Sequence, residues 1–106
     1  MNEDRIQNLE QWIKEDPLEP FNKYALAIEL SASQPGRAAL LFDELLIHHA
    51  DYLPAYYMGA TFFMNQGLIE KATGIFESGI RLAQQQNNNK TLKELTSALD
   101  ELKFDS

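Results

Sequence analysis

The sequence contains no cysteine, and none of its apolar runs approaches the length of a membrane-spanning helix. Without cysteine, disulfides and thiolate metal sites are excluded. A helix that crosses a bilayer needs about 20 mainly apolar residues. The first residues, Met1–Arg5, are acidic and lack the apolar core of a signal peptide. We therefore expect a cytoplasmic protein with no membrane partner.

Basic residues are scarce: Lys and Arg number 9, against 16 Asp and Glu, which gives a formal charge of -7. A nucleic-acid binder needs a basic surface to displace counterions from phosphates, so this balance argues against nucleic acid. The acidity either serves solubility alone or favours basic partners. The length of 106 residues predicts one domain over 1–106.

The chain repeats itself at an offset of 34 residues. Small residues coincide with small ones, large apolar residues with large apolar ones, and charges with charges of the same sign. The matches are Pro20 with Pro54, Ala25 with Gly59, Ile28 with Phe62, Leu30 with Met64, Arg37 with Lys71, Ala38 with Ala72, Leu41 with Ile75, Phe42 with Phe76, Asp43 with Glu77 and Leu46 with Ile80. A match of this extent in one register indicates a true repeat.

Helical spacing of apolar residues predicts six helices and no strands. Repeat 1 covers 20–50 and repeat 2 covers 54–84, each a pair of helices separated by a break at 33–36 or 66–67. A half-repeat helix precedes them at 4–16, and a capping helix follows at 90–103. We expect the polar run 84–89 to be a frayed helix end with a loop, and Thr91–Glu94 to form a capping box.

The second repeat resembles the tetratricopeptide repeat, through Tyr56, Gly59-Ala60, Phe63, Ala72 and Phe76 in the order of that family's pattern. The chain is similar to small bacterial proteins of this family. The resemblance covers nearly the whole chain and implies an all-α, right-handed superhelix of antiparallel helix pairs. Small residues such as Ala38 and Ala72 would then let the paired helices cross closely.

The resemblance also implies a concave groove, lined by the first helix of each pair, that binds an unidentified protein or peptide. Ala27 and Met58 stand where chaperone-binding members carry clamp asparagines, although Lys23 matches a clamp lysine. We therefore expect an apolar, aromatic groove for an amphipathic segment. Alternatively, Tyr57, Met58 and Met64 pack against the terminal helices. The groove residues are Lys23, Tyr24, Ala27, Leu30, Tyr57, Met58, Thr61, Met64 and Asn65.

A second surface is predicted on the helix over 37–49, where Leu40 and Ile47 are one heptad apart and nearly opposite Ala38 and Phe42. Two full repeats bury little apolar surface, so self-association into a homodimer is an alternative function. The other interpretation is that a neighbouring helix covers Leu40 and that Ile47 is a single exposed apolar residue.

Residues for catalysis or for a cofactor are lacking. His48 and His49 are adjacent and point about 100° apart on a helix, so they do not chelate one metal well. No glycine-rich phosphate loop is found, and no serine or threonine has a nearby base. The sequence therefore predicts a protein-binding adaptor that is not an enzyme and holds no metal or cofactor.

Overall fold

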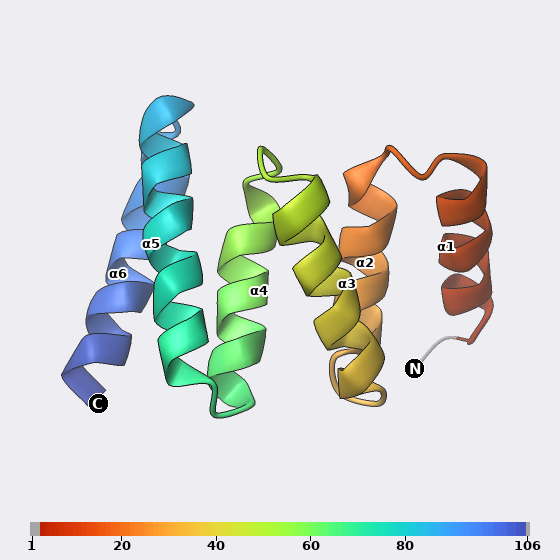
Figure 1. The fold of residues 1–106 in the computed structure, drawn as a ribbon, viewed down its shortest axis with the longest axis horizontal. Coiled ribbons are helices and arrows are strands. Elements are labelled where there is room, and N and C mark those ends of the chain that lie inside the picture. The colour runs from red at the N-terminus through yellow and green to blue at the C-terminus, as the bar shows by residue number, and fades with distance from the viewer. Residues whose placement is uncertain (1–2, 106) are drawn as a thin grey trace. The chain divides into compact units, whose positions relative to one another are not determined.

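The computed structural model describes residues 3–105, and α-helices alone make up the regular structure of this part of the chain. Within residues 3–105 there are six helices and no strand, as the sequence predicts. The helices are α1 Glu3–Glu15, α2 Pro20–Leu30, α3 Pro35–His48, α4 Pro54–Asn65, α5 Ile69–Gln85 and α6 Asn89–Asp105 (Figure 1).

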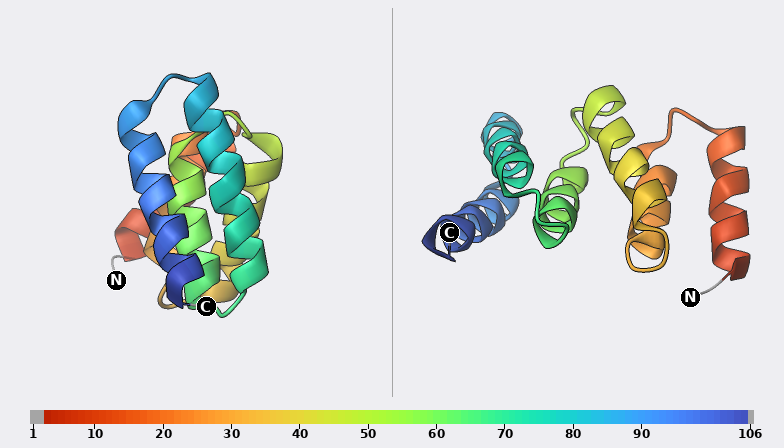
Figure 2. Two further views of the ribbon diagram at one scale, coloured as in Figure 1. Left: turned by 90° about the vertical axis from the view of Figure 1, so that its left-hand side faces the viewer. Right: turned by 60° about the horizontal axis from the view of Figure 1, so that its bottom comes forward.

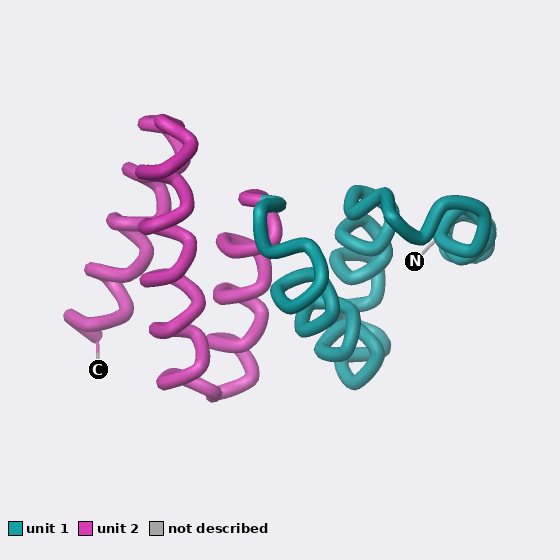
Figure 3. Tube along the Cα trace, turned by 45° about the horizontal axis from the view of Figure 1, so that its top comes forward, with its two compact units in different colours: residues 1–52 teal, residues 53–106 magenta. Residues whose placement is uncertain are grey.

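The chain divides between Tyr52 and Leu53 into two compact units (Figure 3). Unit 1 is residues 1–52 with α1, α2 and α3, and unit 2 is residues 53–106 with α4, α5 and α6. Within each unit, successive helices run in opposite directions (Figure 2). Each unit is thus an antiparallel helix pair with one further helix. A single domain over 1–106 and a right-handed superhelix stay predictions.

Three of the four prolines stand at the start of a helix: Pro20 opens α2, Pro35 opens α3 and Pro54 opens α4. The first N–H groups of a helix have no intrahelical partner, so proline loses nothing there. The predicted break at 33–36 is wrong in its second half. The turn lies at 31–34, because Pro35 and Gly36 already form the first residues of α3.

In unit 1, α2 packs against both α1 and α3. The apolar residues that face this core recur at three- and four-residue steps, as helical periodicity requires. Ala38 of α3 is fully buried, which agrees with a close approach of the helices. The buried set includes Ile6, Leu9, Leu26, Leu30, Ala38, Phe42 and Leu45.

In unit 2, α5 packs against both α4 and α6. A Cβ atom added to Gly79 would lie 2.8 Å from Tyr56 Cβ and 3.1 Å from Leu95 Cδ1. Glycine therefore allows α5 to approach α4 and α6 together. Ala72 and Phe76 on the same helix are fully buried.

The ends of α4 and α5 have the same geometry, although their sequences differ. Gly67 follows α4 with a φ of 83°, and Asn87 follows α5 with a φ of 57°. The Leu68 N–H donates to Phe63 O, and the Asn88 N–H donates to Ala83 O, both at 2.9 Å. These six-to-one bonds are those of the Schellman motif, which satisfies the last carbonyls of a helix.

The N-terminus of α6 is capped by Asn88, whose Oδ1 accepts a hydrogen bond from the Thr91 N–H at 3.1 Å. The predicted capping box at Thr91–Glu94 is wrong, because Thr91 already lies in the first turn of α6. The polar run at 84–89 therefore ends one helix, supplies a residue of positive φ and caps the next helix.

Candidate binding site

The predicted groove residues on α2 are mostly buried. Ala27 and Leu30 have no exposed surface, and Lys23 is 6% exposed. Tyr24 is half-buried, and its ring meets the Tyr52 ring edge-on with centroids 5.6 Å apart. Because α1 and α3 both pack on α2, the expectation that Ala27 and Leu30 contact a partner does not fit this structure.

Lys23 is held by three acceptors within unit 1. Its Nζ donates to Pro17 O at 3.0 Å, lies 2.9 Å from Glu44 Oε1 and lies 3.3 Å from His49 Nε2. A lysine ammonium has three donors and no acceptor, so it can only donate in these three contacts. All three donors are used, which leaves none to clamp a partner's carboxylate.

Sequence reasoning missed this network because its members are far apart along the chain. Glu44 is one turn from His48 on the same helix, whereas the structure brings Glu44 to Lys23 on α2. No local spacing rule links residues 23, 44 and 49. The 34-residue repeat does not reveal it either, since Tyr57, Ser78 and Ala83 stand at the equivalent positions.

The predicted groove residues on α4 are more accessible. Tyr57 is 38% exposed. Met58, Thr61 and Met64 are half-buried, and Asn65 at the end of the helix is exposed. The α4 part of the prediction therefore coincides with accessible surface, in contrast to the α2 part.

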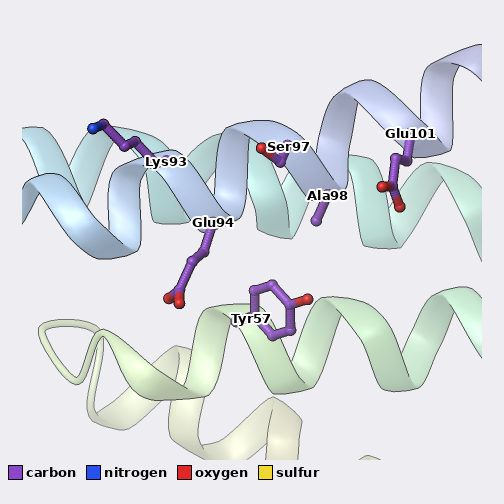
Figure 4. A pocket seen from close by; sticks show the side chains of 6 residues that line it. All are labelled: Tyr57, Lys93, Glu94, Ser97, Ala98 and Glu101. Atoms are coloured by element: carbon purple, nitrogen blue, oxygen red, sulfur yellow. The ribbon is translucent and has the colours of Figure 1, made fainter.

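A pocket of about 330 Å³ lies between Tyr57 of α4 and one face of α6 (Figure 4). The residues from α6 that line it recur at helical steps, so they share one side of that helix. They are Lys93, Glu94, Ser97, Ala98 and Glu101. Sequence reasoning assigned α6 only a covering role. The spacing of Glu94, Ala98 and Glu101 marks a second face beside the buried stripe of Leu95, Leu99 and Leu102.

Tyr57 is oriented by the core behind it. Its ring meets the buried Phe76 ring edge-on, with centroids 6.3 Å apart at an angle of 76°. Glu94 and Glu101 point from α6 toward α4 on either side of the Tyr57 ring, whereas Lys93 points away (Figure 4). The pocket thus combines an aromatic surface with two carboxylates.

A second pocket, also of about 330 Å³, is lined by Met64, Ile69, Leu102 and Asp105. It lies where α4 ends, α5 begins and α6 ends. Met64 is seven residues beyond Tyr57 on α4, which is two helical turns or roughly 10 Å. Three of its four residues are apolar, so this pocket suits an apolar side chain.

The two residues predicted for self-association are both on the surface of α3. Leu40 is 71% exposed and Ile47 is 70% exposed. The interpretation that a neighbouring helix covers Leu40 does not fit these values. Two exposed apolar side chains one heptad apart lie on the same face of α3.

The described residues contain no cluster of three or more His, Cys, Asp or Glu side chains that could hold a metal ion. Within residues 3–105, no helix combines the length and the apolar composition that crossing a membrane requires.

No protein-family model and no curated protein matches the chain. Solved structures that are similar to it include two of a tetratricopeptide repeat domain protein from Salinibacter ruber. A solution NMR structure aligns with a TM-score of 0.76 and 33% identity, over 82% of this chain and 89% of that one. A crystal structure aligns with a TM-score of 0.75 and 31% identity, over 80% of this chain and 97% of that one. With this identity over most of both chains, the present chain belongs to the tetratricopeptide repeat family.

Proposed function

We propose that this protein is a non-catalytic interaction module that binds a polypeptide segment between α4 and α6 of unit 2. The family similarity supports a protein-interaction role in general. The observation that carries the specific proposal is the pocket in which Tyr57 faces Glu94, Ala98 and Glu101. A half-exposed tyrosine held by a buried aromatic ring is a good anchor, because it offers a large contact area at little cost in entropy.

The shape of the accessible surface favours a segment over a small molecule. The second pocket lies farther along α4, at Met64, and half-buried Met58 and Thr61 lie between the two pockets in sequence. A ligand that follows α4 would place one side chain beside Tyr57 and an apolar one near Met64. Methionine adapts to partners of irregular shape. An amphipathic segment therefore fits this face of unit 2.

The proposal differs from the groove expected from the sequence in its extent. Ala27, Leu30 and Lys23 are left out, because the first two have no exposed surface and Lys23 uses its donors internally. The proposed site keeps the α4 residues of that groove and adds the α6 residues of the pocket. The α4 residues are Tyr57, Met58, Thr61, Met64 and Asn65.

The test is a selection from a displayed random-peptide library, run in parallel on the wild-type protein and a Tyr57→Ala variant. Leu18→Ala serves as the control, since it changes an exposed apolar residue that lies outside both candidate surfaces. We expect peptides that bind wild type and the control and that lose about tenfold or more in affinity with Tyr57→Ala. Circular dichroism checks that each variant keeps its helicity. Peptides that bind the Tyr57→Ala variant equally well would contradict this site.

Self-association is the second candidate, and the exposure of Leu40 and Ile47 favours it. In this alternative, the face of α3 that carries both residues meets the same face of a second copy. Solution mass measured over a range of concentrations tests it. A dimer that Leu40→Lys/Ile47→Lys converts to monomer would support the alternative, and a monomer at all concentrations would contradict it.

The proposal also includes a cytoplasmic location and a protein or peptide partner, with no nucleic acid, membrane or cofactor involved. The formal charge of -7 supports the first of these exclusions, because phosphate backbones attract basic surfaces.

A further inference from the structure

We propose that the Tyr57 pocket selects a partner segment that carries an arginine side chain, seated on the Tyr57 ring between Glu94 and Glu101. This inference rests on the proposed function, since it specifies the chemistry of the segment that unit 2 binds. Three observations carry it: the charge of the pocket, the position of the aromatic ring and the small side chain of Ala98.

The pocket has an excess of negative charge. Glu94 and Glu101 are both exposed and line it, and neither carboxylate has a hydrogen-bond or ion-pair partner among the residues that the structure describes. Lys93 also lines the pocket, but its side chain points away from Tyr57 (Figure 4). Two unpaired carboxylates facing the same ring favour a cation there. The overall charge of -7 adds a longer-range attraction for a basic partner.

The spacing on α6 leaves room for a flat cation. Glu94 and Glu101 are seven residues apart, so they lie on one face about 10 Å apart along the helix. Ala98 stands between them and opposite Tyr57 (Figure 4). Because the alanine side chain is a single methyl group, the space above the Tyr57 ring stays open. A larger residue at position 98 would fill it.

Arginine fits this arrangement better than lysine. Its planar guanidinium stacks on an aromatic face and presents several N–H donors to carboxylates at the same time. The edge contact with Phe76 holds the Tyr57 ring in place. The Tyr57 side chain therefore loses little conformational entropy when a cation binds. The same unit contains a cation–π pair of its own, with Lys71 Nζ 3.9 Å from the centroid of the Phe63 ring.

The experiment uses three pentapeptides of alanine and leucine that are identical except at the central residue, which is arginine, citrulline or glutamate. Citrulline has the shape of arginine without its charge. Each is titrated into the full chain, and amide chemical shifts of Tyr57 and Ala98 are followed by NMR. We expect the arginine peptide to bind about tenfold more tightly than the citrulline peptide at low salt, and the difference to shrink at high salt.

Glu94→Gln/Glu101→Gln should remove the arginine preference. The matched control is Glu70→Gln/Glu77→Gln, which makes the same charge change at two exposed residues of α5, also seven apart. That control should keep the preference. If Glu94→Gln/Glu101→Gln keeps it too, the preference comes from overall charge and the inference is overturned.

The outcomes also separate this inference from the proposed function. Equal binding of the three peptides through Tyr57 would overturn the arginine selection and leave the binding module intact. No shift at Tyr57 or Ala98 with any of the peptides would count against both.

Discussion

Positions 23 and 57 are equivalent in the repeat, one on α2 and the other on α4, but their surroundings differ. Lys23 is 6% exposed and has three acceptors, whereas Tyr57 is 38% exposed and lines a pocket. The acceptors of Lys23 lie in the segment before α2, on α3 and directly after α3. In unit 1, α1 packs on α2 itself, while in unit 2, α6 packs chiefly on α5. The repeat therefore predicts the helix, whereas contacts that the repeat does not share decide whether the residue at this position is accessible.

The helix crossings of the two units differ in a related way. Gly79 stands on α5 where Leu45 stands on α3, and Tyr56 stands on α4 where Asn22 stands on α2. In unit 2 the aromatic side chain of Tyr56 lies against the glycine backbone. The larger residue of the pair is thus Tyr56 of α4 in unit 2, but Leu45 of α3 in unit 1. Substitutions at equivalent positions should therefore have unequal effects.

Lys23→Met is expected to have the largest effect on stability. It removes a buried ammonium and leaves Pro17 O and His49 Nε2 without their donor, so we expect a loss of about 2 kcal/mol in the free energy of unfolding. At the equivalent position, Tyr57→Met should lose less than about 1 kcal/mol, because its ring is partly exposed. Urea denaturation followed by circular dichroism measures both.

The two variants also test the comparison of the inner faces. Equal losses would mean that the Lys23 network contributes no more than an exposed side chain. A larger loss for Tyr57→Met would mean that the ring serves mainly the core of unit 2, and the pocket would then be a less plausible binding site.

Gly79→Ala should come next, with a net loss of about 1 kcal/mol. The added Cβ meets Tyr56 Cβ and Leu95, and overpacking of this kind costs about 1–3 kcal/mol. The gain in helix propensity, at most about 1 kcal/mol, offsets part of it. Gly74→Ala in the same helix is the control. No atom outside the neighbouring backbone lies within 4 Å of its added Cβ, so it should stabilise the protein by up to about 1 kcal/mol.

Thermal unfolding of the two alanine variants shows directly whether each substitution raises or lowers the stability of the protein. If both raise the melting temperature, then α5 does not approach α4 as closely as the structure indicates. The proposed difference between the helix crossings at Gly79 and at Leu45 would then be wrong.

The fold could be predicted from local features of the sequence. Pro20 and Pro54 marked helix starts, and the periodic apolar residues around Phe42 and Phe76 marked the buried faces. Pro35 was misjudged because proline fits both a turn and the first residue of a helix, and the local sequence does not decide between them.

The sequence predicts the α4 side of the candidate site but not its α6 side. Tyr57 is one of the groove residues that the family resemblance implies. The α6 face opposite Tyr57 depends on how the last helix is rotated about its axis, and the apolar periodicity indicates only which side of that helix is buried. The burial of Ala27 and Leu30 depends on the packing of α1 and α3. The partners of Lys23 depend on contacts between residues more than twenty positions apart. Such contacts have no signature in one sequence.

Asn88→Ala should lower the unfolding free energy by about 1 kcal/mol or somewhat less, because the Thr91 N–H loses its acceptor at the start of α6. Thr91→Val keeps the side-chain shape and should change it by only a few tenths, roughly, since Thr91 is not the cap. Urea denaturation compares them. A larger loss for Thr91→Val would restore the capping box expected from the sequence and would shift the start of the helix that forms one wall of the pocket.

The smallest effect concerns the paired phenols of unit 1, Tyr24 and Tyr52. Burial raises the pKa of both above 10.0, and for Tyr52 the charges of Tyr24 and Glu19 raise it further. Since the folded state favours the neutral phenols, their contribution is complete below pH 10.0 and is lost as pH rises through the raised pKa values. Between about pH 9 and about pH 11 we expect a loss below about 1 kcal/mol, because both rings are partly solvated. Lysines titrate there too, so the Tyr24→Phe/Tyr52→Phe variant isolates the phenols. It should lose less stability than wild type over this range, and an identical loss would show that the edge-on pair does not couple ionisation to the folding of unit 1.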